Sequence, residues 1–167
     1  MCDFFDPKYQ TEASRTDTEF GIGDDGRMSF TTIEEKDTIT VVKNPAGISL
    51  QFVPVDHNIP IKNESGGEAS LCDAMIYTPF AIERKDIYFI ELKDRSKNWI
   101  SEALDQLKST IHYFSQQYPN ELFRFRTATA SNKQRPFFDY SHKDKCAQFK
   151  SDTGYRLNIN TTVDIHK

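Results

Sequence analysis

The sequence predicts one α+β domain of a three-layer, α/β/α-like kind, built on a mixed β-sheet with a central hairpin and one long amphipathic helix. Segments rich in Val, Ile and Phe come before and after a single long stretch with helical apolar spacing. The 167 residues, 37% of them hydrophobic, match the size of one ordinary domain with its own core. We therefore expect residues 1–167 to form a single domain.

The N-terminal third of the sequence predicts little regular structure until residue 38. Residues 1–36 contain turn formers such as Asp24, Asp25 and Gly26 and show little apolar periodicity, so we expect a poorly structured or peripheral segment. The two apolar segments that follow, 38–43 and 47–55, predict a hairpin.

The middle of the sequence predicts two antiparallel strands. They cover residues 71–78 and 86–93 and are joined by a turn at residues 79–85. Residues 87–92 are almost all apolar, which is typical of a central strand that is covered on both faces.

A long amphipathic helix is the clearest element that the sequence predicts. Apolar residues recur at three- and four-residue steps between Asn98 and Tyr118, and Pro119 then ends the helix. Residues 122–130 predict a further strand. Residues 155–165 alternate between apolar and polar side chains, which indicates a last, half-buried strand.

Two carboxylates and a lysine are expected to meet at one end of the central hairpin. Side chains alternate across a strand, so Glu91 and Lys93 point to the same face, roughly 6 to 7 Å apart. A turn at residues 79–85 brings Asp73 opposite residues 91–93. Charges beside so apolar a strand need compensation, and two carboxylates with a backbone carbonyl and waters suit Mg²⁺. The alternative is a surface salt bridge between Asp73 and Lys93, which would contribute little.

This arrangement resembles the PD-(D/E)XK nuclease superfamily, which includes restriction endonucleases, junction resolvases and RecB-like exonucleases. The resemblance covers about residues 68–130 and depends on Asp73, on the triplet Glu91-Leu92-Lys93 at the end of a strand, and on the helix that follows. Cys72 stands where the motif name has proline. The resemblance implies a restriction endonuclease-like fold, in which Asp73, Glu91 and the Leu92 carbonyl bind Mg²⁺ or Mn²⁺ and Lys93 assists the attacking water.

The family often adds two further side chains to this site. Gln106 is our match for a glutamine on the following helix. An extra acid on an N-terminal helix has no clear counterpart, and Glu68, Glu34 or Glu35 are the substitutes that we consider.

The function that the resemblance implies is metal-dependent hydrolysis of phosphodiester bonds, in DNA rather than RNA, within a restriction or antiphage defence system. The alternative is a catalytically inactive protein-binding module, such as an immunity protein, an inhibitor or an accessory subunit. The net charge of -4 and an acidic start, with nine acids and three bases in residues 1–35, favour this alternative. A minimal core of this size implies a homodimer or a subunit of a larger complex.

A short basic segment is a candidate nucleic-acid surface. Residues 131–150 hold five bases against two acids, with aromatic side chains between them, although a solvated loop would look similar. The expected contacts are Lys133, Arg135, Lys143 and Lys145. No apolar run long enough for a membrane span and no secretory signal is present, so we expect a cytoplasmic protein without a membrane partner.

Overall fold

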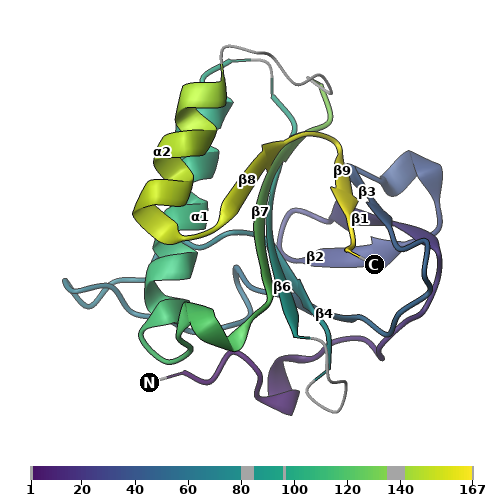
Figure 1. Cartoon of the computed structure of the whole chain (residues 1–167), viewed down its shortest axis with the longest axis horizontal. Coiled ribbons are helices and arrows are strands. Elements are labelled where there is room, and N and C mark those ends of the chain that lie inside the picture. Colours follow the sequence, from purple (N-terminus) through teal and green to yellow (C-terminus); the bar gives the residue numbers. More distant parts are fainter. Residues whose placement is uncertain (1, 80–84, 96, 135–141, 167) are drawn as a thin grey trace.

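Two β-sheets and two helices make up the fold, which a computed structural model describes for residues 2–79, 85–95, 97–134 and 142–166 (Figure 1). The strands are β1 (Glu19–Asp24), β2 (Ser29–Thr32), β3 (Thr40–Lys43), β4 (Gln51–Pro54), β5 (Ala74–Tyr77), β6 (Asp86–Lys93), β7 (Phe125–Asn132), β8 (Arg156–Ile159) and β9 (Thr162–Asp164). The helices are α1 (Trp99–Ser115) and α2 (Lys143–Thr153), with short 3₁₀ helices η1 (Pro7–Tyr9), η2 (Glu35–Asp37) and η3 (Asn120–Leu122).

The larger sheet has the strand order β4-β5-β6-β7-β8 and carries the predicted hairpin at its centre. Strands β4, β5 and β6 run antiparallel, whereas β6, β7 and β8 run parallel, with α1 and α2 as the connections between them. Both helices lie on one side of this sheet (Figure 1). The predicted α+β class, with a mixed sheet, is confirmed.

The other side of the larger sheet is covered by the smaller sheet, β2-β1-β3-β9, and not by helices as the α/β/α-like expectation had it. Alternate residues of β6 supply the two cores. Ile87 and Phe89 pack with α1, whereas Tyr88, Ile90 and Leu92 pack with the smaller sheet. The run of apolar residues in β6 therefore reflects burial on both faces, as predicted.

Helix α1 packs against the larger sheet through one stripe of side chains. Ala103, Leu107, Ile111 and Phe114 are buried at steps of four, four and three residues. The Phe114 ring makes an edge-on contact with Phe89 of β6, at 5.1 Å between ring centroids. In the described part of the chain, neither helix combines the length and the apolar character needed to cross a bilayer.

The N-terminal segment differs from the loop that we expected. Residues 19–24 and 29–32 form strands β1 and β2, and Phe20 and Ile22 are buried between the sheets. Gly21 lies within β1, and a larger residue would not fit there because the segment around η2 lies very close to it. A Cβ at Gly21 would lie 2.1 Å from the Thr38 hydroxyl oxygen, so this glycine permits close packing and does not mark a turn.

Two other predictions fail because the chain changes sheets. The hairpin predicted for 38–55 is wrong: β3 and β4 belong to different sheets, and the Asn44 side chain holds the connecting turn through hydrogen bonds with the Ile48 backbone. The single strand predicted for 155–165 is divided into β8 in the larger sheet and β9 in the smaller one. Helix α2 was missed because Phe149 is its one fully buried side chain, which leaves little periodicity to detect.

Candidate active site

The hairpin register brings the predicted site residues together at one end of β5 and β6. Ala74 pairs with Ile90, so the next position along the hairpin sets Asp73 opposite Glu91, as the turn length predicted. Glu91 and Lys93 continue the face of β6 that packs against α1. The site therefore lies between the end of the larger sheet and the first turns of that helix.

Asp73 is held in place by contacts with three other parts of the chain. Its Oδ2 accepts a hydrogen bond of 2.6 Å from the Leu92 backbone N–H. Its backbone carbonyl accepts hydrogen bonds of 2.8 Å from the Val55 N–H and from the Ser29 hydroxyl of β2. The smaller sheet thus helps to fix the backbone that carries this carboxylate.

Glu91 is almost fully buried and meets Lys93 at the centre of the site. Its side chain is 2% exposed, and its Oε1 lies 3.1 Å from the Lys93 Nζ. The Lys93 Nζ also donates to Gln106 Oε1 at 2.6 Å and to Glu102 Oε1 at 3.0 Å, both on α1. Among the described residues, the other carboxylate oxygen of Glu91 has no hydrogen-bond partner. This leaves one acceptor buried and unsatisfied beside Asp73.

The two carboxylates hold their protons to an unusually high pH. Burial is the largest cause for both, raising the pKa of Asp73 and of Glu91 well above the ordinary range of a carboxyl group. Repulsion between the two carboxylates raises the pKa of Glu91 further, and Lys93 opposes part of this rise. Burial alone would lower the pKa of Lys93, but Glu91 and Glu102 raise it above its usual value. Lys93 is therefore a fixed cation and not a proton acceptor at neutral pH.

This chemistry fits a divalent cation between Asp73 and Glu91. Two carboxylates that face each other in a desolvated site are satisfied either by a shared proton or by a cation, and the partnerless oxygen of Glu91 is suited to ligate one. Leu92 follows Glu91 at this end of β6, and its backbone N–H donates to the Asp73 carboxylate. Over the residues with described placement, no group of three or more His, Cys, Asp or Glu side chains is arranged to hold a metal, so the candidate site depends on two carboxylates.

Comparison of the chain with protein-family models, with curated proteins and with solved structures finds no match in any of the three. The functional interpretation therefore depends on the geometry of this site.

The additional acids near the site differ from those that we considered. Glu68 is exposed in a loop, where its backbone bridges to Lys62 and its charge acts on Asp56. The negative charges that act on Asp73 include those of Asp24, at the end of β1, and Asp56. The sequence offered no signal for Asp24, because Asp24 and the two residues after it have the composition of a simple turn.

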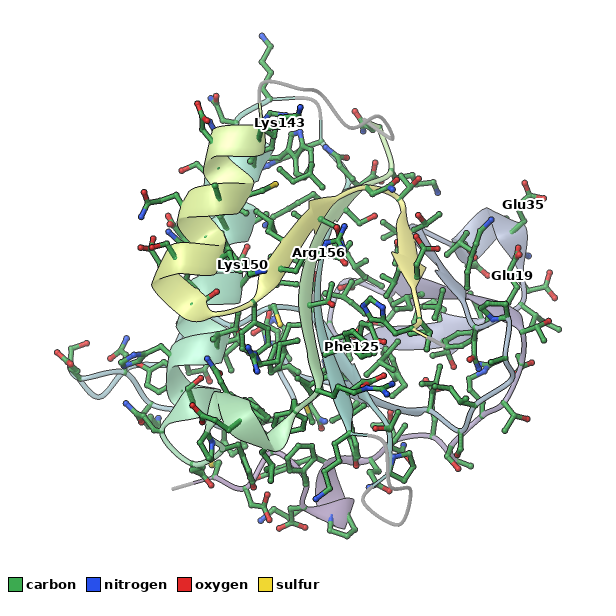
Figure 2. The ribbon with its side chains drawn as sticks, in the orientation of Figure 1. Glu19, Glu35, Phe125, Lys143, Lys150 and Arg156 are labelled. Atoms are coloured by element: carbon green, nitrogen blue, oxygen red, sulfur yellow. The ribbon has the colours of Figure 1, made fainter. Side chains whose placement is uncertain are left out.

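Glu34 and Glu35 are exposed where η2 begins, and Figure 2 shows Glu35 on the outer side of the smaller sheet, across it from the helices. Glu102, in contrast, contacts Lys93 directly and was missed. It lies four residues before Gln106, one helical turn along the same face, so helical spacing would have identified it.

The predicted nucleic-acid contacts are spread over two places in the fold. The Lys133 backbone N–H donates to the Lys93 carbonyl at 2.9 Å, so the backbone of this exposed lysine lies beside the site. Lys143 and Lys145 lie in the first turn of α2 (Figure 2 labels Lys143). Arg135 lies outside the described residues. Phe149, one of the interleaved aromatics, is fully buried in the core and cannot stack on a base.

Proposed function

We propose that this protein is a metal-dependent nuclease that hydrolyses phosphodiester bonds, with DNA as the substrate and Asp73, Glu91 and Lys93 as its central residues. One observation carries the proposal: the buried Glu91, with one carboxylate oxygen lacking a partner among the described residues, faces the half-buried Asp73 and lies next to a lysine that is protonated at neutral pH. Acidic side chains can hold a metal ion that activates water, and a cation can offset the negative charge that develops on the phosphoryl oxygens. This combination therefore suits phosphodiester hydrolysis.

Each side chain has a defined part in this proposal. Asp73 and Glu91, with the Leu92 carbonyl, would hold Mg²⁺ or Mn²⁺, which when bound supplies Lewis-acid activation of the phosphoryl group and of water. Lys93 orients the attacking water and offsets the negative charge that develops on the phosphoryl oxygens. Gln106 holds the Lys93 ammonium through its Oε1, while its amide nitrogen donates to the Leu71 carbonyl at 3.4 Å. Gln106 is therefore a positioning residue.

Cleavage of plasmid DNA and of labelled DNA and RNA oligonucleotides tests the proposal. We expect cleavage with Mg²⁺ or Mn²⁺ and none with EDTA. The Lys93→Ala variant should lose about 10²- to 10³-fold in rate. Lys97→Ala, which changes an exposed lysine four residues further on, is the matched control and should cleave as wild type does. Equal activity of the wild type and Lys93→Ala on every substrate would refute the nuclease assignment.

A second function, that of a noncatalytic protein-binding module, is favoured by the contact between Glu91 and Lys93. The Lys93 ammonium lies 3.1 Å from Glu91, and Glu91 carries no charge while it holds its proton, so the fold does not require a metal for charge balance. Calorimetric titration with Mn²⁺ separates the two proposals. The nuclease proposal expects one site that Asp73→Asn removes, whereas a binding module should bind no ion there. On either proposal, the expected assembly is a homodimer or a complex with a partner subunit.

A further inference from the structure

A basic groove runs along α2 and β8, on an edge of the fold that the candidate active site does not include. Two cavities form it, with volumes of about 250 and 410 Å³. Lys150 and Arg156 line both cavities, which makes the groove continuous. Lys143 lies at one end and Arg124 at the other. Figure 2 shows Lys150 of α2 and Arg156 of β8 side by side, with Lys143 at the other end of α2.

The groove is unusual in a protein with a net charge of -4 because no Asp or Glu is among the described residues that line it. Lys150 and Arg156 are exposed, and neither forms an ion pair with any described carboxylate. Arg124 is 54% exposed at its side chain and lies 3.9 Å from the buried Asp86, so part of its charge also faces the groove. Lys150 and Arg156, which have no carboxylate partner among the described residues, produce a positive potential that attracts polyanions.

The groove is built on a rigid base. The Arg126 guanidinium donates to three backbone carbonyls, those of Asn120, Phe123 and Gly154, and thereby ties the start of β7 to the end of α2. Beside it, the Phe125 ring stacks on His166 at 3.9 Å between centroids, and the Arg124 guanidinium lies 4.6 Å from the Phe125 centroid. This cation–π contact places the Arg124 guanidinium over the Phe125 ring at one end of the groove.

The spacing of the cations matches a nucleic-acid backbone. The α2 residues that line the groove are Lys143, Cys146, Ala147 and Lys150, which is one face of a helix. Seven residues of α-helix span roughly 10 Å, a length that covers two to three phosphates of one strand. The flat guanidinium of Arg124 adds a surface on which a base can stack.

We propose that the groove between α2 and β8 binds the phosphate backbone of a nucleic acid, with Lys150 and Arg156 as its central contacts. A membrane surface fits less well, because among the described residues the exposed large hydrophobic side chain is Ile33, which is not part of the groove. This binding needs neither a metal nor cleavage, so it is tested separately from the nuclease proposal.

Fluorescence anisotropy in EDTA, with labelled duplex DNA, single-stranded DNA and RNA of equal length, measures this binding directly. The test variant is Lys150→Gln/Arg156→Gln. Its matched control is Lys36→Gln/Lys43→Gln, which removes the same charge from exposed lysines on η2 and β3. Thermal melts of both variants confirm that they fold.

The groove variant should bind the nucleic acid that the wild type prefers about tenfold more weakly at 0.1 M salt. The slope of log affinity against log salt should fall by about 2, because each lost phosphate contact removes about 0.9. The control should bind as wild type does. Equal affinity of the wild type and the groove variant, or an equal loss in the control, would overturn the proposal. Loss of binding to phosphatidylserine vesicles without loss of binding to any nucleic acid would overturn it as well.

Discussion

Replacing Glu91 with glutamine should stabilise the metal-free protein at alkaline pH. Burial, and after it the facing carboxylate of Asp73, raise the pKa of Glu91 from 4.5 to about 9. The folded protein therefore keeps a proton on Glu91 that the unfolded chain releases at lower pH. Raising the pH from 5 to 8 favours the unfolded chain, and the free energy of unfolding falls over this range. The Glu91→Gln side chain cannot ionise, so the variant lacks this contribution.

The size of the effect follows from the displacement of the pKa. Each pH unit between the ordinary pKa of 4.5 and pH 8 costs about 1.4 kcal/mol of unfolding free energy, which sets an upper limit of about 5 kcal/mol for the loss at pH 8. Water reaches the half-buried Asp73, and relaxation of the site reduces such penalties. We therefore expect Glu91→Gln to exceed the wild type by about 2 to 3 kcal/mol at pH 8, or roughly 8 °C in Tm, and by less than about 1 kcal/mol at pH 5. Lys93 keeps Glu102 and Gln106 as partners in the variant.

Urea unfolding at pH 5 and pH 8 in EDTA, followed by circular dichroism, measures these differences. Glu64→Gln, at an exposed position in a loop, is the control and should change the free energy of unfolding by no more than about 0.5 kcal/mol. If the wild type and Glu91→Gln lose stability in parallel between pH 5 and pH 8, the reasoning about a buried, protonated Glu91 is refuted.

Three further predictions concern the metal, the packing of β1 and the aromatic core. Mn²⁺ affinity, measured by calorimetry, should rise from pH 6 to pH 8 with release of protons, because the ion replaces protons on Asp73 and Glu91; an affinity that does not depend on pH would contradict this. Gly21→Ala should lower the free energy of unfolding by about 1 to 3 kcal/mol, and adding Thr38→Ala should recover part of the loss; no recovery in urea melts would show that the close contact is not the cause. Phe114→Ala should destabilise the protein by about 3 to 5 kcal/mol, because its ring is fully buried; a loss below about 1 kcal/mol would contradict its place in the core.

The sequence predicted those parts of the fold in which a local pattern coincides with tertiary structure. The bounds of β6 and the face of α1 follow from one apolar run and one helical stripe. The position of Asp73 opposite Glu91 followed from turn length alone. These elements depend on neighbours that are close in the sequence, so the spacing of residue types along the sequence predicts their geometry.

The parts that failed depend on contacts between distant segments. Strands β3 and β4 look like a hairpin, but they pair with β1 and β5, respectively, because each completes a different core. Strand β9 pairs with β3, about 120 residues earlier, which no local pattern indicates. In the same way, Asp24 approaches Asp73 only because the smaller sheet packs across the larger one.

The alternation of β6 between two apolar cores has a consequence for how the hairpin finds its pairing. A slip of β6 by two residues against β5 would leave every apolar side chain on an apolar face, so hydrophobic burial alone does not select the native pairing. What distinguishes the native alignment is polar: the Asp86 N–H donates to the Thr78 hydroxyl at one end of the strand, and the Asp73 carboxylate accepts from the Leu92 N–H at the other. The Asp73 carboxylate at the candidate site thus also helps to select the strand alignment during folding. Replacing it with an apolar residue would remove both the chemistry and the uniqueness of the sheet.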